Sequence, residues 1–308
     1  SSNINKASND SNTSSDGTPS ELYVKAGGYY RVLVTAFPAA EKVGENSFLA
    51  AESFYKAGQL EKAIEDYEFA AYKTGHHSYA LEAGYAAVLT HNELKRLNRA
   101  QNTERESHRY ESISLFTTRF SDDKRVPAVL NDLANEHLKA GRYSDARDSS
   151  RAVLDHPLAT DELKRSSWLV YGHSNFELED YATAEHGYAM ASELIKNDAA
   201  SLELVKERMA ASIYRQGEAS IALGDRQGGV DQFLRLSRVV PSSKLRVNAQ
   251  YDAAVQMLAL EQWRKAIVVL NRFQKEYPAH ALSESIPEKL IYAHLESGNK
   301  LDAADQLI

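Results

Sequence analysis

A short sequence pattern recurs along this chain, and the repetition restricts the possible folds more than any other feature. Each copy has a Gly or polar pair, then Leu or an aromatic residue, a small residue three positions later, and usually a larger one four positions after that. The copies read KAGQLEKAIEDY, KAGRYSDARDSS, ELEDYATAEHGY, ALGDRQGGVDQF, ALEQWRKAIVVL and ESGNKLDAADQLI. Because residues four apart share one face of an α-helix, each copy predicts a turn that leads into a helix.

The spacing of the copies predicts antiparallel helix pairs. Turns are expected roughly 33 to 50 residues apart, near Gly58, His108, Gly141, Glu179, Gly224, Glu261 and Gly298. The small residues after these turns should lie where two helix axes approach most closely, namely Ala63, Ala146, Ala184, Gly229, Ala266 and Ala304. One turn further along, larger residues should fill the space beside them: Tyr67, Tyr188, Phe233, Leu270 and Ile308.

Composition supports one continuous helical body and excludes several function classes. Hydrophobic residues make up 43% of the 308 residues, Gly and Pro are infrequent, and nothing in the middle of the chain reads as a linker. A net charge of -7 disfavours nucleic acid as the main partner. No apolar run approaches the ~18 to 20 residues that span a bilayer. The absence of cysteine excludes disulfides, thiolate chemistry and the usual structural zinc sites.

The pattern resembles the tetratricopeptide repeat, whose consensus is W-x2-L-G-x2-Y, then A-x3-F, then Pro. The matching residues are Trp168, Tyr171, Gly172, Ala184 and Tyr188 in one repeat, with Gly229, Phe233, Pro241 and Ala266, Leu270, Pro278 in the next two. Ala26, Tyr30 and Pro38 match the second helix of a further repeat. The resemblance implies an all-α, right-handed α-solenoid of antiparallel helix pairs.

This resemblance covers residues 19–308 and implies about seven repeats, with a half repeat at the start and a truncated repeat at the end. Residues 1–18 are almost entirely polar, which predicts a disordered tether. Two stretches exceed the usual repeat length, residues 94–109 and 195–208. Both are rich in charge and free of Pro, so they are expected to be helix extensions rather than loops.

No residue pattern indicates catalysis, a metal site or a cofactor. None of the ten histidines lies in an HExxH motif, and no GxSxG elbow accompanies the serines. GDRQGG at residues 224–229 lacks the Lys and Ser/Thr of a phosphate-binding loop and reads as a repeat turn. The chain is therefore expected not to be an enzyme.

Stacked first helices of such a solenoid line a concave groove, which is the candidate binding site. Two rows of side chains should face it, and the candidates are Phe48, Glu52, Tyr85, Asn131, Asn135, His173, Tyr214, Glu218, Tyr251 and Tyr292. Tyr offers contact area at low entropic cost, and two Asn four residues apart can bond an extended peptide backbone. Each Tyr could equally pack between neighbouring repeats.

A second candidate surface is the basic stretch at residues 94–109, which contains Lys95, Arg96, Arg99, Arg105 and Arg109. It could meet an acidic partner, or it could be a solvated helix balanced by Glu93, Glu104 and Glu106, and the second interpretation is preferred. Members of the repeat family that bind acidic chaperone tails use a clamp of Lys, Arg and Asn. Neither groove row here contains Lys or Arg, so a co-chaperone role is not expected.

Within the family, RFQKEYP at residues 272–278 and LFTTRF at residues 115–120 resemble bacterial cell-envelope members. The resemblance implies a periplasmic scaffold or adaptor that binds envelope proteins, with its polar leader following a lipid anchor at the outer membrane. Two alternatives remain: the helical arm of a larger polysaccharide-export or secretion protein, and a cytoplasmic adaptor.

Overall fold

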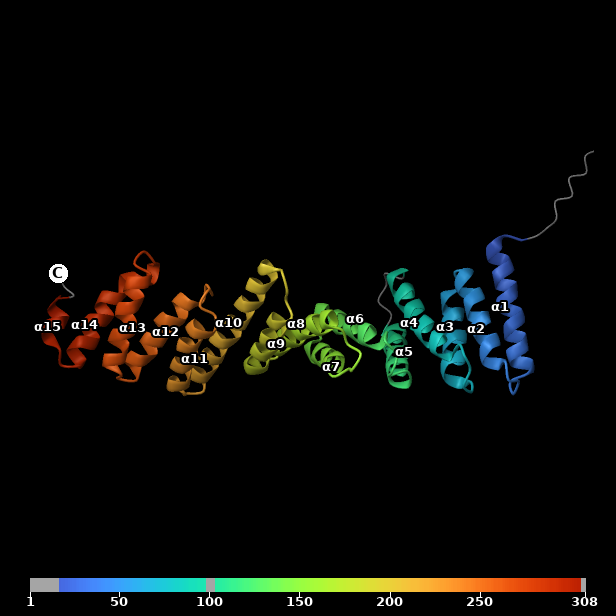
Figure 1. Ribbon diagram of the computed structural model, residues 1–308, viewed down its shortest axis with the longest axis horizontal. Helices are drawn as coiled ribbons and strands as arrows, with labels where there is room; N and C mark the ends of the chain where they lie inside the picture. The colour runs from blue at the N-terminus through green and yellow to red at the C-terminus, as the bar shows by residue number, and fades with distance from the viewer. Residues whose placement is uncertain (1–16, 98–102, 306–308) are drawn as a thin grey trace, which may run out of the picture. The chain divides into compact units, whose positions relative to one another are not determined.

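The computed structural model describes residues 17–97 and 103–305, and helices connected by short turns account for nearly all of them (Figure 1). The chain divides into two compact units, residues 1–126 and 127–308. No strand occurs in the part of the chain that the structure describes. The predicted tether falls almost wholly at residues 1–16, outside the described residues.

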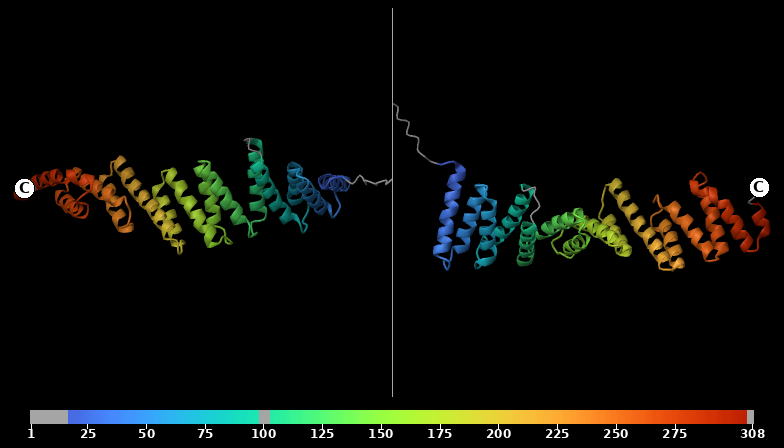
Figure 2. Two further views of the ribbon diagram at one scale, coloured as in Figure 1. Left: turned by 90° about the horizontal axis from the view of Figure 1, so that it is seen from above. Right: turned by 180° about the vertical axis from the view of Figure 1, so that it is seen from behind.

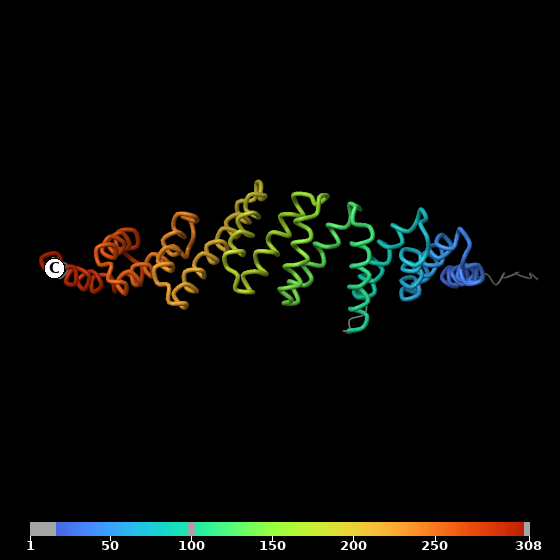
Figure 3. The backbone as a smooth tube through the Cα atoms, turned by 90° about the horizontal axis from the view of Figure 1, so that it is seen from below, coloured from blue at the N-terminus to red at the C-terminus, as the bar shows by residue number. Residues whose placement is uncertain are grey.

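Unit 1 contains α1 (Pro19–Ala36), α2 (Val43–Lys56), α3 (Leu60–Glu68), the π-helical segment η1 (Phe69–Lys73), α4 (Ala80–Leu97) and α5 (Thr103–Arg119). Each α-helix packs against the next one in the chain, as the backbone trace in Figure 3 shows. Thr18 caps α1 through a reciprocal bond with Glu21, which fixes where the first helix begins. The core is rich in Ala, so the helices approach closely.

Unit 2 contains the longer run of helix pairs (Figure 2). Its elements are α6 (Val126–Lys139), α7 (Tyr143–Leu154), α8 (Asp161–Glu177), α9 (Tyr181–Glu193), α10 (Ala199–Ala222), α11 (Arg226–Val239), α12 (Arg246–Ala259), α13 (Trp263–Glu276), η2 (Ala281–Ser285), α14 (Ile286–Glu296) and α15 (Lys300–Asp305). Sequential packing of α7 through α15 confirms the predicted all-α solenoid of antiparallel helix pairs.

Most of the predicted turns are confirmed by backbone conformation. Gly58, Gly141, Glu179, Gly224, Glu261 and Gly298 all have φ between 58° and 88°, the left-handed conformation that ends a helix. The turn predicted at His108 is wrong, because His108 lies inside α5. α4 ends at Leu97 and α5 begins at Thr103, and the residues between them lie outside the described part of the chain.

The predicted helix contacts are confirmed except in the last pair. The predicted small residues are completely buried: Ala63, Ala146, Ala184 and Ala266. The larger residues that follow them are at most 2% exposed: Tyr67, Tyr188, Phe233 and Leu270. Gly229 lies against Gly217 and Ile221, where a Cβ atom would find no room. In the last pair the buried residue is Ala303 rather than Ala304, since the small residue follows the turn residue by five positions, as Ala63 follows Gly58.

The two long stretches are only partly helix extensions. Residues 94–97 and 103–109 are helical, and the rest of that stretch lies outside the described residues. In the second stretch, residues 195–198 form a non-helical connection in which Asn197 has φ 58°, and helix begins at Ala199. The excess length therefore enters α10, which has 24 residues, whereas α6 and α12 have 14 each.

Candidate protein-binding groove

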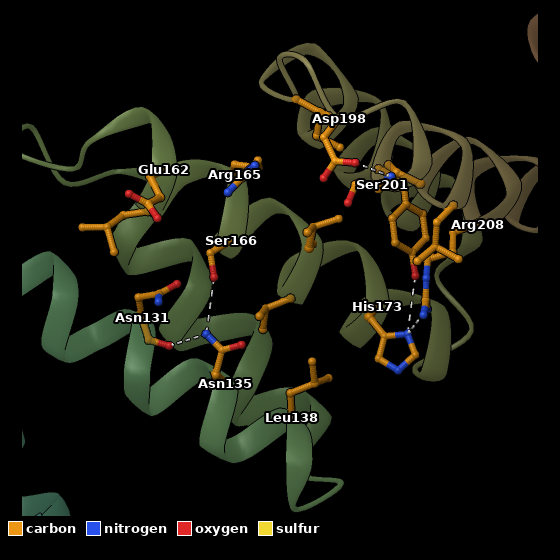
Figure 4. A pocket seen from close by; sticks show the side chains of 17 residues that line it. Asn131, Asn135, Leu138, Glu162, Arg165, Ser166, His173, Asp198, Ser201 and Arg208 are labelled. Carbon is orange, nitrogen blue, oxygen red and sulfur yellow. Dashed lines mark hydrogen bonds between the residues drawn. The ribbon is translucent and has the colours of Figure 1, made fainter.

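A cavity of about 750 Å³ opens in unit 2 between the first helices of three successive pairs, α6, α8 and α10 (Figure 4). Its lining combines apolar, polar and charged side chains: Asn131, Asn135, Leu138, Glu162, Leu163, Arg165, Ser166, Leu169, Val170, His173, Tyr188, Ile195, Asp198, Ser201, Leu204, Val205 and Arg208. Leu and Val give an apolar floor, while amides, hydroxyls and charges surround it, the composition of a site that binds an amphipathic ligand.

One wall of the cavity is made by the additional turns of α10. Asp198 caps this helix by accepting a bond from the backbone N–H of Ser201 at 3.0 Å. Ser201, Leu204, Val205 and Arg208 then follow at spacings that place them on one helix face. An α10 of ordinary repeat length would lack this wall, so the cavity depends directly on the long insertion.

The opposite wall is an amide and hydroxyl cluster on α6 and α8. Asn135 donates from Nδ2 to the backbone oxygen of Asn131 at 2.8 Å and to Ser166 Oγ at 3.4 Å. The buried Asn131 accepts at Oδ1 from Ser167 at 3.2 Å. These bonds fix the two amides relative to each other, so they form a rigid polar edge rather than freely rotating groups.

His173 lies between the walls, where it contacts α9 and α10. Its Nδ1 is 3.3 Å from Nη1 of Arg208 and 3.5 Å from the hydroxyl of Tyr188. Burial lowers the pKa of His173 below 6.5, and the positive charge of Arg208 lowers it further. The ring is therefore neutral near pH 7 and accepts a hydrogen bond from Arg208, which holds the guanidinium beside the cavity.

Charges of both signs line the cavity. Arg165 and Glu162 come from α8, while Arg208 and Asp198 come from α10. Hydrogen bonds from Ser201 lower the pKa of Asp198, and the charge of Arg165 lowers it a little more. Charges of both signs attract neither acidic nor basic partners in general. They favour one of the two directions in which a peptide chain could lie in the cavity.

The structure brings three of the ten predicted groove residues to this cavity: Asn131, Asn135 and His173. In unit 1, Phe48 stacks on Tyr79 with ring centroids 4.9 Å apart. Glu52 accepts a hydrogen bond from Tyr67 at 2.5 Å.

Tyr85, also in unit 1, lies under the guanidinium of Arg125, whose carbon is 4.4 Å from the ring centroid. Its ring also contacts Phe116, at a centroid distance of 5.7 Å. The predicted residues of unit 1 are thus engaged within the unit.

The other predicted residues of unit 2 also have partners within the unit. Tyr214 donates a hydrogen bond to Asp252. Glu218 pairs with Arg215 at 2.8 Å. Their side chains therefore serve packing and pairing in this structure.

The last two predicted residues behave similarly. The Tyr251 hydroxyl lies 3.0 Å from Ser285 Oγ. Tyr292 meets Trp263 edge to face at 5.4 Å, although it remains half exposed. Of these two, only Tyr292 presents much surface.

Sequence reasoning did not identify Arg165 and Arg208, the two cationic residues of the cavity. Arg165 lies one helical turn before Leu169, outside the two rows that were aligned. Arg208 lies 16 residues before the turn residue Gly224, the position that Leu163 of α8 holds before Glu179, and neither groove row includes that position. The detectable signal was the excess length at residues 195–208, with apolar and polar residues at helical spacing.

The basic stretch at residues 94–109 is largely paired where the structure describes it. Lys95 contacts Glu106 at 3.2 Å and Arg105 contacts Glu61 at 3.3 Å. Arg109 is buried and bonds Asn92 and Glu106. These ion pairs favour the interpretation of a charge-balanced helix surface over a basic ridge for an acidic partner.

None of the helices described at residues 17–97 and 103–305 has the length and apolar character needed to cross a membrane. Over the same residues, His, Asp and Glu side chains nowhere gather in a group of three or more that could hold a metal ion.

Comparison with known families identifies one of the helix pairs. Residues 248–280, which include nearly all of α12 and the whole of α13, match the family model described as Tetratricopeptide repeat. This segment is a tetratricopeptide repeat. The tetratricopeptide pattern of a turn with positive φ, a small residue five positions later and a large one nine positions later also occurs at Gly58, Glu179 and Gly224.

Solved structures to which this chain is similar include the MamA protein and the TPR2AB domain of yeast Sti1 in its complex with pHSP90. MamA is 14% identical with a TM-score of 0.35, and the match covers 59% of this chain and 88% of MamA. The Sti1 domain is 13% identical with a TM-score of 0.29, covering 86% of this chain and all of the domain. No curated protein matches the sequence.

Proposed function

We propose that this chain is a protein-binding scaffold that holds a segment of a partner protein in the cavity between α6, α8 and α10. The observation that carries the proposal is the wall built by the additional turns of α10. The lengthened α10 places Leu204, Val205 and Arg208 on the one face that lines the cavity. Lengthening the helix alone would not require such residues on that face. Tetratricopeptide repeats supply the rigid frame.

The chemistry of the cavity fits a peptide segment better than a small charged ligand. Leu163, Leu169 and Leu204 offer apolar contact for side chains, and the Asn135 amide lies at the edge where a peptide backbone would pass. Arg165 and Arg208 lie among Glu162 and Asp198, which suits a partner with charges of both signs.

We further propose that the partner is a protein of the bacterial envelope and that the chain acts in the periplasm, anchored at the outer membrane. The support is the sequence resemblance at residues 272–278 and 115–120 together with the polar leader at residues 1–18. Fractionation of cells that express the native gene tests the location. Recovery in the cytosolic fraction alone would reject it.

Capture from envelope extracts tests the scaffold function. Leu204→Glu places a charge on the cavity wall. Because Leu204 is exposed, the fold should be retained, while the amount of partner captured should fall at least tenfold. Leu223→Glu is the matched control, since Leu223 is exposed at the other end of α10 and outside the cavity. Equal capture by wild type and Leu204→Glu would contradict the proposal.

A further inference from the structure

Helix α13 carries basic side chains along its exposed face. Its inner face is completely buried and consists of Ala266, Leu270 and Phe273. The opposite face is exposed and carries Arg264, Lys265, Val268, Arg272 and Lys275. At 3.6 residues per turn these five side chains lie within about 100° of the helix circumference. They form one surface, the basic band, in which cations surround Val268, itself 67% exposed.

The exposure of the basic band is not explained by the position of α13 late in the chain. Val268 and Lys275 lie seven and fourteen positions after the left-handed turn residue of their helix pair. Asp231 and Arg238 hold the same positions on α11, and both are exposed although α12 and α13 follow that helix. These positions therefore stay open when another pair packs after the helix.

Most of the basic band has no counter-charge within the described chain. Arg264, Lys265 and Lys275 make no hydrogen bond or ion pair with any residue that the structure describes. Arg272 is paired with Glu276 at 2.7 Å. The band is thus a local positive field on a chain whose net charge is -7.

The basic band begins at a hollow in the surface. A cavity of about 420 Å³ lies at the start of α13 and is lined by Glu261, Gln262, Trp263, Arg264, Lys265 and Ser297. Two cations of the band belong to this lining. Trp263 is partly exposed and offers an apolar surface, so a side chain of a ligand can enter the hollow beside the cations.

We propose that the basic band binds a short acidic segment of a protein partner, at a site separate from the cavity between α6, α8 and α10. Charge complementarity selects this ligand, since unpaired cations attract an anionic chain. From Arg264 to Lys275 the band is about 16 Å long at the helical rise of ~1.5 Å per residue. An extended segment of about five residues covers that length at ~3.3 Å per residue. Exposed Val268 favours an apolar residue among the carboxylates of the segment.

Larger anionic surfaces fit the basic band less well. Glu261 is exposed at its start, and Asp231 is exposed on α11, which shares a buried cluster with α13. A flat bilayer or a nucleic acid duplex would meet these carboxylates together with the band, and the net charge of -7 repels both. A short segment would contact the band without them.

A synthetic peptide tests the proposal in solution. The probe is a fluorescent peptide of about six Glu and Asp residues around a central Leu, and its anisotropy reports binding. Lys265→Glu with Lys275→Glu should weaken binding at least tenfold, because two attractions become repulsions. Higher ionic strength should weaken binding to wild type.

The matched control is Arg147→Glu with Arg151→Glu on α7, which changes the net charge by the same amount. Arg147 contacts Asp148 at 3.0 Å and Arg151 contacts Asp155 at 2.9 Å, so this surface is already neutralised. Binding by the control should stay within about twofold of wild type. Circular dichroism should show that both double variants keep the wild-type fold, since the substituted side chains are exposed.

Three results would overturn the proposal. The first is no binding of the peptide by wild type. The second is an equal loss in the two double variants, which would show that only total charge matters. The third is tighter binding of anionic lipid vesicles or duplex DNA than of the peptide.

A photoreactive residue in place of Val268 tests the same surface in cells. Mass spectrometry should identify the cross-linked segment as acidic. Lys265→Glu with Lys275→Glu should abolish this cross-link, whereas Leu204→Glu in the other cavity should leave it, so the two sites can fail separately. A neutral or basic segment at position 268, or a cross-link that survives the double variant, would contradict the proposal.

Discussion

Tyr67 in unit 1 and Tyr188 in unit 2 occupy the same position of a helix pair, nine residues after the turn residues Gly58 and Glu179. Both are buried, and each directs its hydroxyl toward the residue fifteen positions earlier on the preceding first helix. In unit 1 that residue is Glu52, at 2.5 Å. In unit 2 it is His173, at 3.5 Å.

The difference between these two hydroxyl contacts goes with a difference between the grooves beside them. Tyr67 holds Glu52 tightly, and Phe48 stacks on Tyr79, so this stretch of unit 1 is filled by its own side chains. In unit 2 the looser contact leaves His173 beside a cavity, which the long α10 deepens. The two pairs thus differ in two features: the residue that the buried Tyr hydroxyl contacts, and the length of the first helix that follows.

Removing the two hydroxyls gives the largest expected contrast. Tyr67→Phe should lower the free energy of unfolding by about 1 to 2 kcal/mol, because it removes a short hydrogen bond to a carboxylate. Tyr188→Phe should cost no more than about 0.5 kcal/mol, because its contact with His173 is long. Urea titration followed by circular dichroism measures both.

A control separates the hydroxyl from the packing of the ring. Glu52→Gln keeps the side-chain shape and an acceptor oxygen, so Tyr67→Phe should cost less in that background than in wild type. Equal losses for the two Tyr→Phe variants would show that the tight and loose contacts do not distinguish the two grooves.

Smaller effects are expected at the turns. Unit 1 has Gly58 as its left-handed turn residue, whereas unit 2 has Gly at three such turns and Glu at two, Glu179 and Glu261, with φ 63° and 58°. Left-handed conformation strains any side chain with a Cβ atom, so Glu179→Gly and Glu261→Gly should each stabilise the chain by about 0.5 to 1 kcal/mol. Gly58→Ala should destabilise it by about 1 kcal/mol. Thermal denaturation reports both signs, and loss of stability in the Glu→Gly variants would contradict the turn assignment.

The repeat pattern was enough to predict the helix pairs, because the residues that define it act locally. Gly141 and Gly224 end helices through their own backbone freedom, and Ala184 allows close packing through its own small size. The turn predicted near His108 is wrong because the sequence there has no Gly, and the residue five positions later is the large Ile113. In the last helix pair the buried small residue is Ala303 and not the predicted Ala304, because the prediction placed it six positions after Gly298 instead of five.

The site was harder to predict because it depends on contacts between helices. Aligning groove positions identifies which residues could face the groove but not which are already engaged, as Tyr214 is by Asp252. Arg208 aligns with Leu163 of α8, six residues before the nearer of the two groove positions, so neither groove row includes it. Length differences between repeats were the informative signal, and only the structure shows which face they build.

Site-specific photo-cross-linking tests the central claim, that a partner segment lies between α6, α8 and α10. A photoreactive residue in place of Ser166 lies on the cavity wall, and the same residue in place of Asp148 lies at an exposed position on α7, outside the cavity. In living cells, the photoreactive residue at position 166 should cross-link to one discrete protein, and Leu204→Glu should abolish this cross-link. The photoreactive residue at position 148 should give no such cross-link. A cross-linked partner at Asp148 and none at Ser166 would contradict the account.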